Sequence, residues 1–202
     1  MIDLAGLACH SSRRMRALAE APDLLLAAAL VGLDVTARLL PHAPDFTPVA
    51  ASALFAATVL RVRALGLLVP VAALLIGDTL HGFYDWRMMA IVYGALTLPA
   101  CAACLSGRLR QPRMIVPVML SSSLAFFAIT NFAVWALTPM YPAGAGGLLA
   151  CYVAGLPFLK YTIAGDLVWA AALFGGYRLV MNRLGDRLGA LHGAVRRIPR
   201  PA

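Results

Sequence analysis

The chain has 202 residues, of which 61% are hydrophobic and 13% are charged, with a formal net charge of +8. Soluble domains are about half apolar and about a quarter charged, whereas apolar stretches of about 18 or more residues indicate membrane spans. This composition excludes an ordinary soluble domain, and cytoplasmic loops explain the excess of cations better than nucleic-acid binding does. We predict an all-α integral membrane protein that forms a single transmembrane domain over residues 1–202.

In chain order, residues 1–22 predict a cytoplasmic segment, because their charges follow the first apolar residues and no secretory signal fits that order. Six transmembrane helices are predicted at residues 23–40, 47–60, 64–83, 86–106, 114–137 and 163–180. The apolar stretch 141–161 is interrupted by glycines and Pro157, which favours a re-entrant or surface helix over a seventh span. Residues 181–202 predict a basic amphipathic cytoplasmic tail that anchors to the inner leaflet or, alternatively, docks a partner.

The distribution of cations predicts the orientation of these spans. With the N-terminus inside, fourteen arginines lie in the inner segments, and only Arg38, Arg87 and Lys160 lie outside. Cytoplasmic loops of membrane proteins carry the excess of lysine and arginine. Both termini are therefore expected in the cytoplasm, in a multi-pass protein of the bacterial inner (plasma) membrane.

Polar side chains gather in the outer halves of the predicted spans. Arg38 ends the first span, and Asp78, Asn131 and Asp166 lie near the outer ends of the third, fifth and sixth spans. Ionisable groups inside a membrane are costly and usually face the bundle interior, where they find partners. The pattern favours an outward-facing pocket in which a cationic Arg38 would suit a carboxylate or another planar anion.

Simpler interpretations of the same residues stay open. Arg38 could pair with Asp78 or Asp166 and only lock helices together, and Asp34 could also be a helix-locking acid. Tyr84, Trp86 and Trp135 suit an interfacial aromatic belt. Four further residues are equally well explained as solvated loop residues: Asp45, His81, Asp85 and Arg87.

Several segments together carry a resemblance to a known group of proteins. They are RLLPHAPDFTPVAASALFA, LLIGD, ITNFAVW, MYP, LLACYVAGLPF and AGDLVWAAALFGGY, between about Leu33 and Tyr177. The chain resembles a family of uncharacterised bacterial membrane proteins assigned to transport. That family is in turn similar to the substrate-binding S-components of energy-coupling-factor (ECF) vitamin transporters. The sequence departs from the pattern at Asp45, where asparagine is expected, and the added negative charge weakens the case for an anionic ligand.

The resemblance implies a six-helix S-component-like bundle with both ends inside and a pocket open to the outside. It also implies docking to a shared coupling subunit through small residues on the first helix, where Ala28 and Gly32 form a suitable pair. Together with the polar pattern, it marks the expected substrate-binding residues, which are Arg38, His42, Phe46, Thr47, Asp78, Asn131, Trp135, Tyr141 and Asp166.

The leading functional hypothesis is the substrate-binding membrane component of a vitamin or small-metabolite importer. Its expected partners are membrane lipids, a small-molecule ligand, and an ECF coupling subunit with its ATPases, since the chain has no GxxxxGK[ST] motif of its own. The alternative is an accessory or structural subunit of a larger membrane complex. An enzyme is not expected, because HExxH and GxSxG motifs are absent. We therefore predict no catalytic residue, no metal site and no cofactor.

Overall fold

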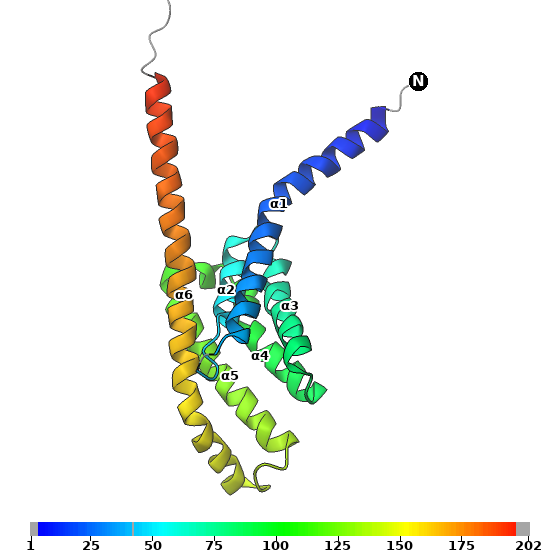
Figure 1. Ribbon diagram of the computed structural model, residues 1–202, viewed down its shortest axis with the longest axis vertical. Helices are drawn as coiled ribbons and strands as arrows, with labels where there is room; N and C mark the ends of the chain where they lie inside the picture. Colours follow the sequence, from blue (N-terminus) through cyan, green and yellow to red (C-terminus); the bar gives the residue numbers. More distant parts are fainter. Residues whose placement is uncertain (1–3, 42, 197–202) are drawn as a thin grey trace, which may run out of the picture.

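The computed structural model describes residues 4–41 and 43–196, with side chains described for residues 21–41 and 43–186 (Figure 1). Every regular element in this part of the chain is helical. The helices are α1 (Leu4–Leu39), α2 (Val49–Val59), α3 (Ala64–His81), α4 (Trp86–Leu105), α5 (Ile115–Leu137) and α6 (Ala145–Arg196), with short 3-10 turns at Gly107–Arg110 and Pro112–Met114. The all-α class is confirmed.

Four of these helices, α3, α4, α5 and α6, are long and apolar enough to cross a membrane. Many large apolar side chains point outward from them, for example Leu68 and Leu75 on α3 and Val168 on α6. Exposed leucines and valines in such numbers suit a lipid environment. These findings support a membrane protein, while the count of six spans and their orientation stay predictions.

The second predicted span, residues 47–60, corresponds to a short helix in the centre of the bundle. Helix α2 has 11 residues, so at 1.5 Å per residue it is about 16 Å long, against about 30 Å for the hydrocarbon core of a bilayer. Its nine residues from Val49 to Ala57 are all buried. Alanines dominate this helix, which lets its neighbours approach closely on every side. It therefore works as the core of the bundle and is too short to cross a membrane alone.

Three segments that we predicted to lie outside the spans, residues 1–22, 141–161 and 181–202, are in their described parts mostly continuous with the long helices α1 and α6. Helix α1 begins at Leu4, so residues 4–22 do not form an element of their own, and α6 runs for 52 residues from Ala145 into the predicted tail. The stretch 141–161, expected as a separate re-entrant or surface helix, mostly lies inside α6, and this expectation was wrong. Figure 1 shows α1 and α6 extending beyond the bundle at the same end.

One glycine in this stretch, Gly155, packs against a neighbouring helix and does not break α6. It fits against α5, where a Cβ would clash with Asn131 Oδ1. Tyr152 donates a hydrogen bond to the carbonyl of Ala128 at 2.7 Å, and the Phe127 and Tyr152 rings meet edge to face at 5.6 Å. An apolar helix tolerates glycine and proline when neighbouring helices support it. The first part of α6 therefore forms an antiparallel hairpin with α5.

The crossing of α2 and α3 depends on one glycine, Gly66. A Cβ at this position would lie 2.6 Å from Ala57 Cβ and 2.7 Å from Ala57 Cα. Because these atoms belong to a buried backbone, they have little room to move. We expect Gly66→Ala to lower the free energy of unfolding by about 1–3 kcal/mol, measured by denaturant titration in detergent.

Gly94 on α4 gives the matched control, since a Cβ there would meet nothing within 4 Å. Gly94→Ala should stabilise the helix by about 0.5–1 kcal/mol, because alanine loses less backbone entropy than glycine. Equal effects of the two substitutions would contradict the close crossing of α2 and α3.

Asp85 caps the beginning of α4. Its Oδ1 accepts hydrogen bonds from the backbone N–H of Arg87 at 2.9 Å and of Met88 at 3.3 Å, and its carboxylate pairs with the Arg87 guanidinium. The hydrogen bond from the Arg87 side chain, followed by those from the backbone, lowers the pKa of Asp85 below its ordinary 3.8. Asp85 is thus the N-cap of a helix and more than a solvated loop residue.

A lowered pKa in the folded state gives stability at pH values above 3.8, which is lost as the pH falls through the folded-state pKa. We therefore expect Asp85→Asn to melt at a lower temperature than the wild type at pH 7. The difference should close as the pH is lowered below 3.8, measured by thermal melting across a pH series. A difference that stays constant down to the acid limit would contradict a contribution from the charge.

Candidate functional site

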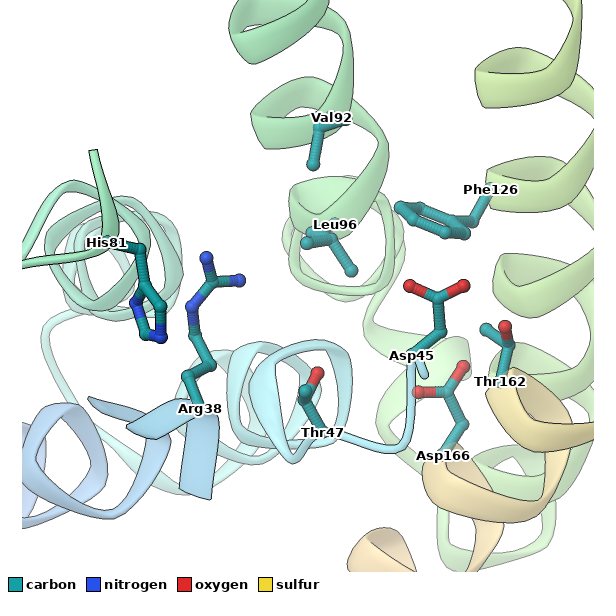
Figure 2. Close-up of a pocket in the computed structure, with 9 residues that line it drawn as sticks. All are labelled: Arg38, Asp45, Thr47, His81, Val92, Leu96, Phe126, Thr162 and Asp166. Carbon is teal, nitrogen blue, oxygen red and sulfur yellow. The ribbon is translucent and has the colours of Figure 1, made fainter. Parts of the chain in front are cut away.

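A pocket of about 230 Å³ lies where the ends of α1 and α3 meet α4, α5 and α6. Figure 2 shows nine of the residues that line it, which come from α1, α3, α4, α5 and α6 and from the α1–α2 connection. They are Arg38, Asp45, Thr47, His81, Val92, Leu96, Phe126, Thr162 and Asp166. A few polar groups converging on an apolar wall are typical of small-molecule sites.

Arg38, Asp78 and Tyr93 form a network beside this pocket that joins three helices. Arg38 Nη2 lies 2.6 Å from Asp78 Oδ1, and the Tyr93 hydroxyl donates to Asp78 Oδ2 at 2.8 Å. Both oxygens of a nearly buried carboxylate are therefore satisfied, as a charge in a dry environment requires. Of the two pairings that the sequence left open for Arg38, with Asp78 or with Asp166, the structure shows the one with Asp78. The ion pair positions the guanidinium at the edge of the pocket.

The surroundings of Arg38 hold the guanidinium in one place. A Cβ on Gly77 would lie 2.8 Å from Arg38 Nε, so only glycine leaves this space for the arginine. His81 Nδ1 lies 3.0 Å from the carbonyl of Gly77, and because a carbonyl only accepts, Nδ1 must donate and carry the ring hydrogen. Burial raises the pKa of Tyr84 in the α3–α4 connection, and the charge of Asp78 raises it further.

Two buried aspartates each pair with a serine on a neighbouring helix. Ser52 of α2 donates to Asp34 of α1 at 2.5 Å, and Ser123 of α5 donates to Asp166 of α6 at 2.5 Å. Asp34 is fully buried, and Asp166 is 4% exposed. Asp34 therefore joins α1 to α2, as a helix-locking acid does. Asp166 joins α5 to α6 and also lines the pocket.

The structure brings together some of the residues that the sequence marked for binding. Arg38, Thr47 and Asp166 line the pocket, and Asp78 lies behind Arg38 as its ion-pair partner. Phe46 lies next to α6, where a Cβ on Gly165 would be 3.0 Å from Phe46 Cα. His42 lies outside the residues that the structure describes.

Three other marked residues lie in the α5–α6 hairpin and not along the pocket. The side chain of Asn131 donates through Nδ2 to the backbone carbonyl of Phe127 at 2.8 Å. The backbone carbonyl of Asn131 accepts a hydrogen bond from Cys151 Sγ at 3.2 Å. Trp135 Nε1 donates to the carbonyl of Pro142 at 3.1 Å. Tyr141 is half-buried in the connection before α6. These residues hold the hairpin together.

The pocket also includes residues that the sequence did not single out for binding, and helical spacing could have found two of them. Thr162 lies one turn before Asp166, and Phe126 lies three residues after Ser123, so each shares a helix face with a residue of the buried Asp166–Ser123 pair. Asp45 and His81 were not singled out for binding, because a position in a solvated loop explained them as well as a position in a pocket did. Val92 and Leu96 are ordinary apolar residues of α4, and their sequence positions carry no sign of a site.

The fold and the site together define the class of the protein, which is an all-α membrane protein with a polar pocket among its helix ends. Residues 19–188 match the profile of DUF6580, a family of unknown function, and the chain belongs to this family. No curated protein and no solved structure matches the chain.

Proposed function

We propose that this protein is the substrate-binding membrane component of a small-metabolite importer, with its pocket open to the outside of the bacterial inner membrane. The observation that carries the proposal is the position of the pocket at the opposite end of the bundle from the arginine-rich connections. Arg61 and Arg63 follow α2 and Arg108 follows α4, whereas Arg38, Asp45 and His81 lie at the other end. Cation-rich connections face the cytoplasm, so the pocket end faces outward.

The size of the pocket supports a small ligand. Its volume of about 230 Å³ is below the range of about 300–1,000 Å³ that is usual for drug-sized ligands. A small metabolite or a small vitamin fits this volume better than a large cofactor does. The lining mixes hydroxyls and charged groups with Val92, Leu96 and Phe126, which suits a compact polar molecule that has an apolar part.

The surface of α1 supports docking to a transmembrane partner. Ala28 and Gly32 are both exposed on this helix, and a Cβ on Gly32 would meet nothing within 4 Å. Small residues on a lipid-facing helix allow another helix to approach closely. Because the chain has no P-loop, an ECF coupling subunit and its ATPases would supply the energy for transport.

The experiment that tests the proposal compares three proteins purified from native-like membranes. Val92→Trp fills the pocket, and Val168→Trp makes the same substitution on the exposed face of α6, where Val168 is 54% exposed. Mass spectrometry should find the same small molecule with the wild type and with Val168→Trp, but not with Val92→Trp. The melting temperatures of all three should stay similar, which excludes unfolding as the cause. If none of the proteins retains a metabolite, or if all three retain it equally, the proposal is wrong.

A second function, an accessory subunit of a larger membrane complex, is favoured by the Arg38–Asp78–Tyr93 network. These three side chains join α1, α3 and α4 and satisfy both oxygens of Asp78, as a purely structural network would. Since Arg38 has this structural role, Arg38→Ala would disturb folding under either function. Val92→Trp discriminates better, because an accessory subunit should keep its partners when the pocket is filled.

A further inference from the structure

The lining of the pocket is divided by charge. In Figure 2, Arg38 and His81 lie on one side and Asp45 and Asp166 on the other, with Thr47 between them. The first pair comes from the ends of α1 and α3, and the second comes from the α1–α2 connection and α6. The ligand therefore meets groups of opposite charge at its two ends.

The basic side has hydrogen-bond donors available to an anion. A guanidinium has five N–H donors, and one nitrogen of Arg38 binds Asp78. Arg38 Nε is buried against Gly77 and has no hydrogen-bond partner among the described residues, so an anion would be bound by the remaining N–H groups of the guanidinium. His81 donates through Nδ1 to the carbonyl of Gly77, so its Nε2 accepts a hydrogen bond when the ring is neutral and donates one to an anion when the ring is charged. A carboxylate or a phosphate matches this set of groups.

The acidic side has a carboxylate that lacks a basic partner. Asp166 is 4% exposed, and its hydrogen bond comes from the neutral hydroxyl of Ser123. Neither of the two ion pairs found among the described side chains includes Asp166. Thr162 lies one turn earlier on the same face of α6 and also lines the pocket. A carboxylate as deeply buried as this one is stable in its charged form only beside a compensating charge, and a ligand ammonium group beside Thr162 would supply that charge.

The wall of the pocket is partly apolar. In Figure 2, Leu96 of α4 lies between the two charged sides, Val92 lies on the same helix, and Phe126 of α5 lies beside Asp45. We propose that the pocket takes a small zwitterion, with its anionic group at Arg38 and His81, its ammonium group at Asp166, and a short aliphatic spacer beside Leu96. This inference rests on the proposed function and narrows the class of its substrate.

The divided lining also excludes ligands that have charge of one sign. An anion large enough to fill the pocket would place negative charge beside Asp166, and a cation of the same size would place positive charge beside Arg38. Like charges brought together in a partly dry site disfavour binding, which is how a site rejects the wrong ligand. A zwitterion avoids both repulsions.

The test uses the full chain in lipid nanodiscs and a series of ω-amino carboxylates, from glycine to 6-aminohexanoate, as probes of charge separation. Each probe has two matched controls, the carboxylate and the amine of the same chain length. At saturation, the member that fits should raise the melting temperature by about 2–4 °C, whereas its two controls should not. Asp166→Asn should weaken binding of that member by about tenfold or more. Asp85→Asn, the same substitution at a residue that does not line the pocket, should leave its affinity unchanged.

Three results would overturn the inference. They are a failure of every ω-amino carboxylate to raise the melting temperature, equal stabilisation by a carboxylate or an amine, and unchanged affinity in Asp166→Asn. The metabolite retained in the mass spectrometry experiment separates this inference from the proposed function. A retained molecule with charge of only one sign overturns the zwitterion and leaves the importer standing. The absence of both a retained molecule and probe binding overturns both.

Discussion

Asp78→Asn is expected to be strongly destabilising, because it leaves the Arg38 guanidinium without its counter-charge. Removing one partner of a buried ion pair costs about 3–5 kcal/mol. The Arg38 side chain is 22% exposed and Asp78 is 4% exposed, so water can hydrate the arginine only in part. We therefore expect a loss of about 3 kcal/mol, at the lower end of this range. Denaturant titration in detergent, with helix content as the signal, measures the loss.

Two controls show whether the charge pair is responsible. The double variant Arg38→Met with Asp78→Leu removes both charges and should recover most of the lost stability, because apolar residues of similar volume replace a buried pair well. The pair between Asp85 and Arg87 is exposed, with side-chain exposures of 44% and 52%, so Asp85→Asn should have a much smaller effect. A stable Asp78→Asn variant would show that the network does not hold α1 against α3.

Leu54→Ala is the second substitution expected to have a large effect, because Leu54 lies at the centre of the bundle. Its side chain is fully buried on α2 and belongs to a cluster with Met119 of α5 and Ala170 of α6. Truncating a buried leucine costs about 2–5 kcal/mol, since the removed atoms leave a cavity. The same denaturant titration should report a loss in this range.

Leu68→Ala on α3 is the matched control, because Leu68 is 57% exposed. Lipid can fill the space that this truncation leaves, so its effect should be small. If the two leucine variants were equally stable, α2 would not be the core of the bundle.

The sequence predicts α3, α4 and α5 closely because local signals mark their ends. The predicted spans 64–83, 86–106 and 114–137 correspond to Ala64–His81, Trp86–Leu105 and Ile115–Leu137. Gly82 with its positive φ of 103° follows α3, the cap of Asp85 begins α4, and Pro112 precedes α5. Such signals depend on neighbouring residues alone, so they can be read without tertiary structure.

The continuity of α6 could not be predicted in the same way. Glycines and Pro157 normally indicate a break, but here Gly155 packs against Asn131 and lets α5 approach. The reason for Gly155 lies on another helix, at Asn131, which is 24 residues away in the sequence. The local sequence cannot distinguish a glycine that ends a helix from a glycine that allows two helices to pack closely.

The part of the candidate site that contains ionisable residues could be predicted from the sequence. Arg38, Asp78 and Asp166 stand out because a membrane protein rarely places ionisable groups in its spans without a reason. Asn131 and Trp135 share the same end of the bundle, but Asn131 lies about 140° around the helix from Phe126, at 100° per residue. That rotation turns Asn131 toward the α5–α6 hairpin and away from the pocket. A polar residue at the same end of the bundle as the pocket therefore lines the pocket only if it lies on the helix face that points toward the pocket.

We propose that the pocket opens on the outer side of the membrane, and labelling of a single cysteine at its rim tests this orientation. The four native cysteines, Cys9, Cys101, Cys104 and Cys151, are replaced by alanine, and Asp45→Cys or Arg108→Cys is introduced. A membrane-impermeant maleimide should label position 45 in intact bacterial cells, and position 108 only after permeabilisation. Labelling of position 45 only after permeabilisation would contradict the account, because the pocket would then face the cytoplasm.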